Sequence, residues 1–350
     1  MPKIAIIGTT SWGITLGIVL ARKGLEVRLW ARTEREAIEL RDAGPNPALL
    51  SGITFPPQLS VTSLLDEALA EAKVVILAVP SQTMRQNIKL VADHLNKSVL
   101  IVSAAKGLEI GSNKRMSQVI AEEIDPRFWP NICVLSGPNL SGEILHDLPA
   151  ATVVAAENEA VVRMAQKLLT APNLCVYTNT DVIGVELGGA LKNIIALGAG
   201  MVDGLGYGDN AKAAFITRGL TEMAALGVAL GASPLTLSGL AGLGDLIATC
   251  ASPLSRNHYV GVELTKGRSL EEITNSMTGV AEGVSTTVAV WNLAQQLGLE
   301  MPLTEKIYQV LYKGLDPRQV MIELLGNEGR HELAGRKWKL ASLFKRRRRS

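Results

Sequence analysis

Two polar residues, Lys192 and Asn193, interrupt the segment 187–196, which is otherwise apolar and rich in glycine. The apolar pattern predicts a buried helix, and a lysine is rarely buried unless it is paired or takes part in chemistry. Burial or a neighbouring cation lowers the pKa of a lysine, so Lys192 could act as an acid near neutral pH. The alternative is a surface lysine whose aliphatic stem lies along the helix.

Lys106 and Asp245 are two further charges in apolar surroundings. Lys106 follows a predicted strand at 99–102, at the sheet edge where α/β proteins bind ligands. Asp245 is the only charged residue in the segment 241–249. Each signal is weak alone, but together they indicate a polar site that is built from distant parts of the chain.

Ser255, Arg256 and Asn257 supply one cation and two hydrogen-bonding side chains at the start of a predicted helix. Such a helix start favours an anion, because its backbone amides and the helix dipole add to the cation. By itself Arg256 would also suit a solvated helix surface. Combined with the two lysines and Asp245, the segment indicates an anionic carbonyl or alcohol substrate that is presented to a nicotinamide.

A glycine turn at Gly8 to Gly13 follows the first predicted strand and precedes a helical pattern at 14–23. This context is typical of a dinucleotide-binding loop, in which unpaired amides at a helix N-terminus hold a diphosphate. Thr10 stands where the middle glycine of that loop is expected. The alternative is a tight turn without a ligand. Because Ile14 rather than a lysine follows Gly13, an ATPase-type phosphate loop is excluded.

Arg32 ends the second predicted strand, 19 residues after Gly13. An acidic residue at this position would hold the ribose 2′-hydroxyl of NAD, whereas an arginine accommodates the 2′-phosphate of NADP. Arg32, with Arg35 nearby, therefore predicts that NADPH is tolerated or preferred. Two surface arginines at a helix start are the alternative.

Other chemistries find no support in the sequence. The four histidines show no metal-ligand spacing, so we expect no metal site. The chain also lacks a Gly-x-Ser-x-Gly motif of the kind that carries a nucleophilic serine.

The elements that must position these residues fall into two classes. Short β-branched runs alternate with helical patterns in the first half, which predicts a Rossmann-type α/β domain with a mostly parallel sheet. The predicted strands are 3–7, 26–30, 74–78, 99–102, 132–135, 152–155 and 175–177. After about residue 180 no strand is expected, and helices are predicted at 182–201, 211–230, 283–297 and 302–312. We therefore expect a dinucleotide-binding domain at 1–180, an all-α substrate and catalytic domain at 181–335, and a tail at 336–350.

The charge distribution and the cysteine content further limit the possible partners and the cellular compartment. The net charge is +2, from 35 Lys and Arg against 33 Asp and Glu, but eight of the cations lie in 336–350, where there is no acid. The remaining body is thus acidic, with 27 cations against 33 acids, and binding of nucleic acid to it is not expected. The three cysteines are odd in number and widely spaced, which indicates reduced thiols in the cytoplasm.

Two segments bear on membranes. The uncharged run 223–244 contains five glycines and a proline, so it predicts two packed helices with a turn and no membrane span. The basic tail mixes apolar residues with a run of Lys and Arg. It suits a solvated end, a weak contact with an anionic membrane surface, or less readily a nucleic-acid contact.

Taken together, the motifs make the chain similar to the bacterial type of the NAD(P)-dependent sn-glycerol-3-phosphate dehydrogenase family. The resemblance covers about residues 3–326. It rests on SAAKGLE at 103–109, LSGP at 135–138, GGALKN at 188–193, GAGMVDG at 198–204, GLGDL at 242–246, SRN at 255–257 and VAEG at 280–283. Thr10 departs from the family's usual glycine, and Asn139 stands where a small hydroxyl residue is commoner.

The resemblance implies a role for each matching residue. Lys192 matches the catalytic acid/base. The residues that match nicotinamide-nucleotide contacts, in addition to Gly8 and Gly13, are Ser11, Trp12, Arg32, Lys106, Ser141, Arg256, Val280 and Glu282. Those that match glycerol-phosphate contacts are Lys106, Gly137, Asn139, Lys192, Asp245, Ser255, Arg256 and Asn257.

The resemblance also implies the reaction and the partners. The substrates would be dihydroxyacetone phosphate and sn-glycerol 3-phosphate, the cofactor NADP or NAD, and the assembly a homodimer in a cytoplasm where it feeds phospholipid synthesis. The alternatives are a related reductase, of the ketopantoate or 6-phosphogluconate type, and a weakly catalytic nucleotide-binding sensor.

Overall fold

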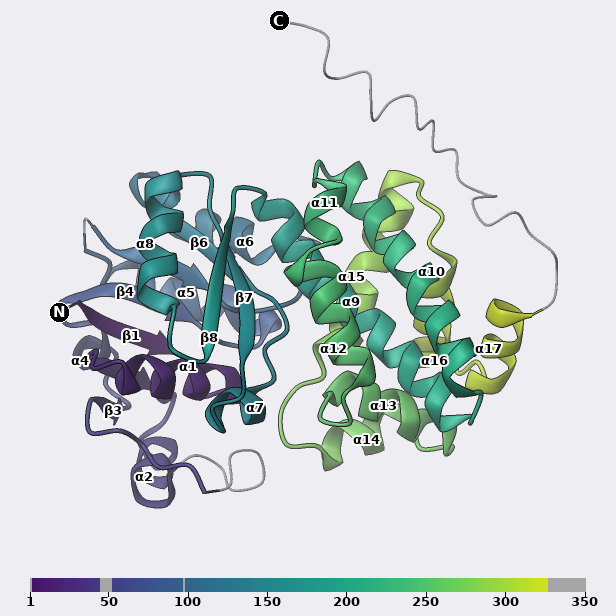
Figure 1. Ribbon diagram of the computed structural model, residues 1–350, viewed down its shortest axis with the longest axis horizontal. Coiled ribbons are helices and arrows are strands. Elements are labelled where there is room, and N and C mark those ends of the chain that lie inside the picture. Colours follow the sequence, from purple (N-terminus) through teal and green to yellow (C-terminus); the bar gives the residue numbers. More distant parts are fainter. Residues whose placement is uncertain (1, 45–51, 97, 327–350) are drawn as a thin grey trace, which may run out of the picture.

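The computed structural model describes residues 2–44, 52–96 and 98–326. Figure 1 shows an α/β part, in purple to teal, beside a helical part, in green to yellow. The last strand ends at Asn179 and the next helix begins at Val182. Residues 181–326 contain no strand, as the sequence predicts. The predicted tail at 336–350, and the end of the segment before it, lie outside the described residues.

One eight-stranded sheet forms the centre of the α/β part, with the strand order β3-β2-β1-β4-β5-β6-β7-β8. All neighbouring strands are parallel except β6 and β7, so the predicted mostly parallel sheet is confirmed. The strands are β1 Lys3–Ile7, β2 Val27–Trp30, β3 Leu59–Thr62, β4 Ala72–Leu77, β5 Leu100–Ser103, β6 Ile132–Ser136, β7 Ala150–Ala155 and β8 Leu174–Asn179.

The sequence missed β3, which is a short strand at the sheet edge. It has only two aliphatic side chains, those of Leu59 and Val61, which alternate with Ser60 and Thr62. The long apolar runs that revealed the central strands come from burial on both faces, and an edge strand of four residues lacks that burial. The other seven strands were predicted to within two residues at each end.

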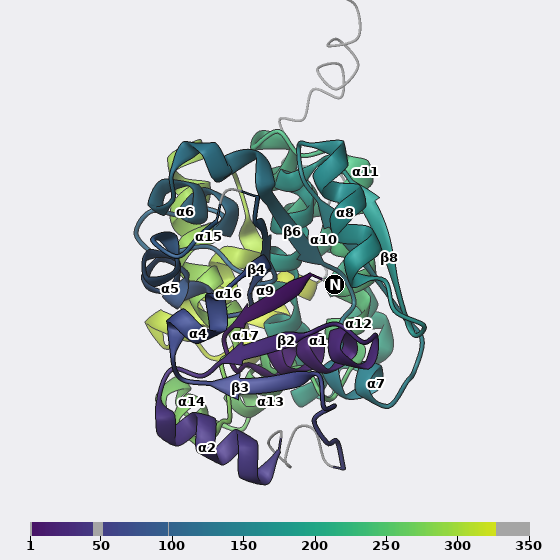
Figure 2. The same ribbon diagram turned by 90° about the vertical axis from the view of Figure 1, so that its left-hand side faces the viewer.

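Helices cover both faces of the sheet, which Figure 2 shows from the side of the α/β part. Ile4 and Ile6 of β1 pack on one face with α1 and α8, while Ala5 and Ile7 pack on the other with α5 and α6. The helices of this part are α1 Ser11–Arg22, α2 Glu34–Ala43, α4 Leu65–Leu69, η1 Ser81–Thr83, α5 Met84–Ala92, α6 Met116–Glu123, η2 Pro126–Asn131, α7 Ser141–Leu145 and α8 Glu159–Leu169.

The strand order reverses between β1 and β4. The chain leaves β1 toward β2 on one side, and it leaves β4 toward β5 on the other. A crevice therefore opens at the carboxyl ends of these two strands, which is where open α/β sheets bind their ligands. The residues after β1 and after β4 are those of the predicted nucleotide loop and the segment 78–80.

Helix α9, Val182–Gly204, is the centre of the helical part. Every residue from 187 to 202 is buried, and α10, α12, α13 and α15 pack around it. The helices are α10 Gly208–Ala229, α11 Pro234–Leu237, the π-helical turn η3 Leu240–Gly244, α12 Asp245–Ala251, α13 Arg256–Thr265, α14 Leu270–Ser276, α15 Glu282–Leu297, α16 Pro302–Lys313 and α17 Pro317–Leu325. The four helices predicted here are confirmed, with ends that differ by up to three residues.

Two helical stretches, Val182–Gly204 and Pro234–Ala251, are long and apolar enough to cross a membrane by length and composition alone. The apolar window of the first is 83% buried inside the fold, as in a core helix. The second is assembled from α11, η3 and α12. Since α10 ends at Ala229 and α11 begins at Pro234, the predicted break within 223–244 is confirmed.

Candidate active site

A cavity of about 540 Å³ lies between the sheet edge and the helical part. The α/β part contributes the loop after β1, residues 78–80 after β4, Lys106 and the segment 139–142. The helical part contributes residues of α9 and α12 together with 254–257 and 278–282. Most of the residues selected from sequence therefore meet in one cavity. Gly8, Gly13, Arg32 and Gly137 do not line it.

The turn after β1 has the geometry of a dinucleotide loop. Gly8 has a φ of +110°, and a Cβ at this position would lie 2.9 Å from the carbonyl oxygen of Ala78. The Thr10 hydroxyl donates to that carbonyl over 2.6 Å and accepts from the Gly13 amide over 3.1 Å. Thr10 thus serves as the N-cap of α1. Its hydroxyl is therefore engaged by the protein both as a donor and as an acceptor.

The start of α1 has donors available for a nucleotide. Among the described residues, no acceptor is found for the backbone amides of Ser11 and Trp12. The indole Nε1 of Trp12 is buried and also lacks a hydrogen-bond partner among the described residues. Amides at a helix N-terminus and a buried indole donor fit the diphosphate and polar groups of a nicotinamide nucleotide.

Arg32 lies at the end of β2, where it is exposed beside the loop. Its backbone amide donates to Glu36 over 3.1 Å, and the other carboxylate oxygen of Glu36 accepts from the Thr9 hydroxyl. The Arg32 guanidinium forms no ion pair with another described residue, whereas Arg35 pairs with Glu39 over 2.8 Å. Of the two arginines, Arg32 is the one left available for a 2′-phosphate.

Asp245 is shared by two lysines at the bottom of the cavity. Lys192 donates to its Oδ1 over 2.9 Å, and Lys106 donates to its Oδ2 over 2.6 Å. Lys192 also donates to the Thr249 hydroxyl over 2.6 Å, and Lys106 to the Gly137 carbonyl over 2.8 Å. Lys192 is 6% exposed and Asp245 2% exposed, so Lys192 is not the surface lysine of the alternative interpretation.

Burial and charge act against each other in this cluster. Burial lowers the pKa of Lys106 to about 8, with Asp245 opposing the shift and the Lys192 cation adding to it. For Asp245, burial would raise the pKa, but the two lysines outweigh burial and hold it below its ordinary value. The cluster is therefore an ionised carboxylate between two cations, one of which can lose its proton near neutral pH.

Close helix packing brings Lys192 to Asp245. A Cβ on Gly188 would lie 2.5 Å from the carbonyl oxygen of Ala241, so only glycine allows η3 to approach α9 this closely. The π-helical turn η3 ends directly before Asp245, which opens α12. The glycines that surround Lys192 in the sequence thus serve the approach of the two backbones.

Arg256 reaches across the cavity to the loop after β1. Its Nη2 donates to the Ser11 hydroxyl over 2.9 Å, and it forms no ion pair with the described residues. Burial lowers the pKa of the Arg256 guanidinium, and the charge of Glu282 partly offsets this effect. A largely desolvated cation without a paired carboxylate is suited to bind an anion.

Asn257 and Ser255 are more constrained than the sequence suggested. The Asn257 amide donates to Asn193 over 2.8 Å and accepts from the Gly283 amide over 2.9 Å. Ser255 caps α13 by accepting from the His258 amide over 3.2 Å. Both side chains line the cavity. Within the protein, Asn257 also links α13 to α9 and α15, and Ser255 fixes the start of α13.

Four other predicted residues lie at the rim or behind the cavity. Asn139 donates to Thr152 over 3.1 Å, and its buried Oδ1 has no partner among the described residues. Ser141 opens α7 and Val280 is 48% exposed; both line the cavity. Gly137 lies behind it and contributes its carbonyl to Lys106.

Glu282 links the two parts of the protein. Its carboxylate accepts from the Ser81 amide over 2.9 Å and from the Ser81 hydroxyl. Burial raises the pKa of Glu282, while the bonds from Ser81 oppose that effect. The side chain that the resemblance assigned to the cofactor is therefore occupied by η1 in this structure.

Sequence reasoning left out three residues of the site. Thr249 lies four residues after Asp245, a spacing that places both on one helix face, so this residue could have been found. Asn193 was recognised as a polar residue in an apolar helix but was not assigned. No sequence pattern marked Ser81, because its partner, Glu282, is 201 positions away in the chain.

No group of three or more His, Cys, Asp or Glu side chains that could hold a metal ion occurs in residues 2–44, 52–96 and 98–326. The three cysteines, all of them among the described residues, form no disulfide, and only Cys175 is exposed. The polar groups that line the cavity are the lysine, carboxylate, arginine, amide and hydroxyl groups of its residues.

The chain matches known proteins over nearly its full length. Residues 3–162 match the family model described as NAD-dependent glycerol-3-phosphate dehydrogenase N-terminus, and residues 181–322 match the corresponding C-terminus. A relative from Dehalococcoides mccartyi, named glycerol-3-phosphate dehydrogenase [NAD(P)+], is 63% identical over 99% of this chain and 97% of its own. A relative of the same name from Geobacter metallireducens is 46% identical over 94% of this chain and 98% of its own.

The fold has a solved counterpart. The crystal structure of glycerol-3-phosphate dehydrogenase from Coxiella burnetii superposes with a TM-score of 0.88 at 37% identity, covering 93% of this chain and 99% of that one. Two family models together span most of the chain, and the two relatives match it over nearly its full length. The chain belongs to the NAD-dependent glycerol-3-phosphate dehydrogenase family.

Proposed function

We propose that this protein interconverts dihydroxyacetone phosphate and sn-glycerol 3-phosphate with NADP or NAD, and that Lys192 is the acid/base. The observation that carries the proposal is the buried cluster in which Asp245 joins Lys192 and Lys106, open to the cavity that also contains the start of α1. Family membership supports the same reaction. In the cell the product would supply phospholipid synthesis.

In the reductive direction Lys192 donates a proton to the carbonyl oxygen of the substrate. When bound, the nicotinamide nucleotide supplies the hydride that goes to the carbonyl carbon. Asp245 and Thr249 fix the Lys192 ammonium by the hydrogen bonds that they accept from it. Lys106 adds a second cation, which stabilises negative charge as it develops on the oxygen.

Arg256 and Asn257 would hold the substrate phosphate. The Arg256 cation is desolvated and has no carboxylate bound to it among the described residues, which supports this role. Ser255 would contribute by setting the start of α13, and Asn139, which lines the cavity, by its Oδ1, which has no partner among the described residues. Binding energy from the phosphate then serves to orient the carbonyl for transfer.

The cofactor would lie along the loop after β1. Gly8 and Gly13 shape the loop, Ser11 and Trp12 supply donors, and Arg32 receives the 2′-phosphate of NADP. Ser141, Val280 and Glu282 would complete the cofactor site at the rim of the cavity. For Glu282 this role requires that it also keep, or exchange, its bonds with Ser81.

The test is Lys192→Ala, assayed by consumption of NADPH with dihydroxyacetone phosphate and with 2-keto acids as substrate controls. Loss of a positioned proton donor lowers kcat by about 10²- to 10⁴-fold. Lys212→Ala is a matched control, because Lys212 pairs with Asp203 over 2.5 Å outside the cavity. Near-wild-type turnover of a folded Lys192→Ala variant would refute the assignment. Faster turnover of 2-keto acids by the wild type would instead favour a related reductase.

Three wider assignments belong to the same proposal. We divide the chain into a dinucleotide-binding domain at 1–180, a helical substrate domain at 181–335 and a basic tail at 336–350, and we expect a cytoplasmic homodimer. Light scattering after size-exclusion chromatography tests the dimer. For the tail, which lies outside the described residues, liposome co-sedimentation of the full chain and of a chain cut after Gly335 tests weak binding to anionic lipid. Equal sedimentation of the two chains excludes the membrane contact.

A further inference from the structure

The loop that carries Lys106 is anchored in both parts of the protein. Leu108 is 1% exposed and belongs to the hydrophobic core of the helical part. Glu109, the next residue, turns instead toward α5 of the α/β part. Gly107 lies against η1, since a Cβ here would be 2.6 Å from the Ser81 Cβ. The place of Lys106 in the cavity therefore depends on how this loop is held.

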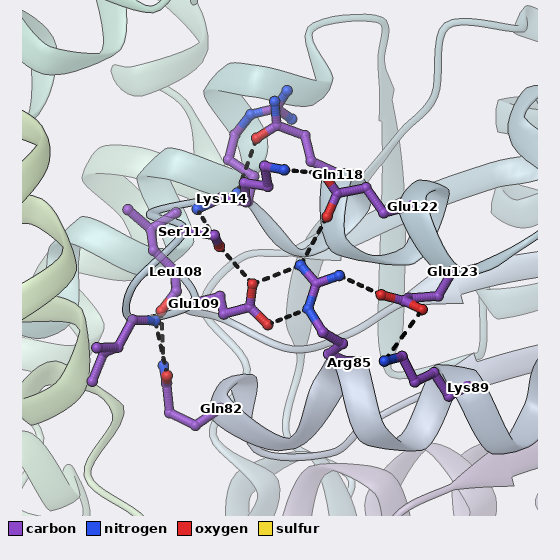
Figure 3. A network of polar contacts seen from close by, with 12 residues as sticks. Gln82, Arg85, Lys89, Leu108, Glu109, Ser112, Lys114, Gln118, Glu122 and Glu123 are labelled. Atoms are coloured by element: carbon purple, nitrogen blue, oxygen red, sulfur yellow. Dashed lines mark hydrogen bonds and ion pairs between the residues drawn. The ribbon is translucent and has the colours of Figure 1, made fainter.

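Gln82 of η1 brackets the loop backbone. Its Nε2 donates to the Leu108 carbonyl over 2.7 Å, and its Oε1 accepts from the Ile110 amide over 3.0 Å. Figure 3 shows this side chain directed at the loop backbone. One side-chain amide thus satisfies a donor and an acceptor of a segment that is in neither a helix nor a strand.

Arg85 of α5 holds the loop side chain Glu109. Its Nε and Nη2 donate to the two carboxylate oxygens over 2.8 Å and 2.7 Å, which is a bidentate pair. The same guanidinium donates to Glu122 over 2.8 Å and to Glu123, both on α6 (Figure 3). These hydrogen bonds, above all those that Glu109 accepts, raise the pKa of Arg85. Glu109 is thereby tied through Arg85 to the α5–α6 pair.

The charges of this network balance. Lys89 lies 3.7 Å from Glu123, and Lys114 pairs with Glu122, so three cations face three carboxylates. The side chains of Glu109 and Glu123 are only 15% and 16% exposed. A partly buried bidentate pair within such a network is stronger than an isolated surface pair, which adds little stability.

We propose that Gln82, Arg85 and Glu109 are positioning residues that hold the loop so that the Lys106 ammonium reaches Asp245. The charged groups that face Lys106 are Asp245 from α12 and Lys192 from α9, while Glu282 from α15 faces Gly107. If the loop loosens, the flexible lysine stem withdraws from Asp245 and the ammonium regains water. Regained water reverses the burial that lowers the pKa of Lys106.

The first experiment measures the pKa of Lys106 by its rate of acetylation against pH, read by mass spectrometry on the full chain without ligand. Glu109→Ala is compared with Glu122→Ala, a control in which Arg85 also loses one carboxylate partner and Lys114 loses its ion pair, while the bidentate Arg85–Glu109 pair and the Gln82 contacts to the loop backbone stay in place. We expect Lys106 to titrate near pH 8 in the wild type and in Glu122→Ala, and nearer its ordinary pKa of 10.5 in Glu109→Ala. The same titration in all three proteins would overturn the proposal.

The second experiment is kinetic and rests on the proposed function. A misplaced group costs on the order of 10- to 100-fold in rate, so kcat should fall by that factor in Glu109→Ala, with the cofactor KM within about twofold. Glu122→Ala should keep kcat within about twofold, and Glu109→Gln, which keeps one acceptor for Arg85, should recover part of the loss. Equal loss in Glu109→Ala and Glu122→Ala would mean a structural role only and would overturn the proposal.

The two readouts separate this proposal from the proposed function. A wild type without turnover of dihydroxyacetone phosphate, but with the expected change in Lys106 titration, would refute the reaction and support the positioning. If Glu109→Ala fails to fold, Gln82→Ala replaces it, because that variant frees the loop backbone without removing a charge. Wild-type titration of Lys106 in a folded Gln82→Ala protein would count against the proposal.

Discussion

At the scale of residues, the cavity is governed by one carboxylate that two lysines share. Asp245 stays ionised because Lys106 and Lys192 both donate to it, and each lysine is fixed in turn by one further acceptor. Neither lysine can be removed without changing the charge that the other experiences. The same three side chains thus provide two lysine ammonium groups beside one fixed carboxylate, and burial lowers the pKa of one of these lysines, Lys106, to about 8.

The residue Arg32 sets the expected choice of cofactor. Replacing Arg32 with Asp removes the cation and adds repulsion toward a 2′-phosphate, so NADPH affinity should fall about 10- to 100-fold while NADH affinity changes little. Fluorescence titration with both nucleotides measures the ratio. Arg35→Asp is the matched control, since Arg35 pairs with Glu39 along α2. An unchanged ratio in Arg32→Asp would remove the argument for a 2′-phosphate site.

At the scale of elements, buried or partly buried polar side chains fix where the helices of the site begin. Thr10 caps α1, Ser255 caps α13, and Glu186 of α9 accepts from the Ser117 amide over 2.7 Å at the start of α6. Each cap satisfies amides that would otherwise have no partner within the helix. The starts of these helices are therefore set by specific contacts and not by apolar pattern alone.

Thr10 should contribute to stability as a cap, whatever it does for the cofactor. Thr10→Ala removes the acceptor for the Gly13 amide and should lower the free energy of unfolding by about 1 kcal/mol, whereas Thr10→Gly should cost only a few tenths. Urea unfolding of both variants measures the difference. Equal stability of the wild type and Thr10→Ala would contradict the capping role.

Glu222 makes the junction of α10 and α16 sensitive to pH. It accepts from the amides of Leu303 and Thr304 over 2.6 Å and 3.1 Å, yet burial raises its pKa to about 7. Because the folded pKa lies above the unfolded value of 4.5, its contribution to stability is fully present below about pH 4.5. That contribution is lost as the pH rises through about 7.

Glu222→Gln tests this contribution, since glutamine imitates the protonated acid. The difference in unfolding free energy, variant minus wild type, should increase between pH 5 and pH 7 by at most about 1.4 kcal/mol per pH unit. Urea unfolding at several pH values gives the difference directly, with the other titrating groups common to both proteins. A difference that does not vary with pH would contradict the raised pKa.

At the scale of the whole molecule, three polar contacts join the two parts around the cavity in addition to the ion pair of Lys106 with Asp245. They are Arg256 with Ser11, Glu282 with Ser81, and Glu186 with Ser117 and Arg115. Leu108 adds an apolar contact by entering the helical core. The cavity has walls from both parts, so a ligand bound there contacts both.

Cofactor binding should therefore protect both parts from hydrogen exchange. With NADPH in excess we expect slower exchange at the start of α1 and also in segments 254–257 and 278–282, all of which line the cavity. Binding at 100 times Kd would add about 2.7 kcal/mol to the free energy of unfolding. Hydrogen-exchange mass spectrometry locates the protection. Protection confined to residues before 180 would contradict a cavity that both parts complete.

Most of the fold was readable from local pattern. Seven of the strands, four helices after residue 180 (α9, α10, α15 and α16) and the change near residue 180 follow from apolar runs and their period, because burial of one or both faces of an element requires such a pattern. The edge strand β3 has no such apolar run and was not predicted. The roles of Ser81, Gln82 and Arg85 were also invisible, since each of their contacts joins positions that are close only in the folded chain.

The sequence by itself determined the residue types: a glycine turn and a lysine that each follow a strand, a second lysine and an aspartate in apolar segments, and an arginine at a helix start. Those types suffice to suggest a nucleotide and an anionic substrate. Burial of a charged side chain costs free energy, so charged residues in apolar segments are found mainly where the chemistry requires them. Only the tertiary structure decided that Asp245 binds both lysines, that Thr10 and Asn257 are engaged by the protein, and that Arg256 reaches Ser11. The physical reason is that pairing energies depend on distance, and the distance between residues far apart in the chain is fixed by packing rather than by local pattern.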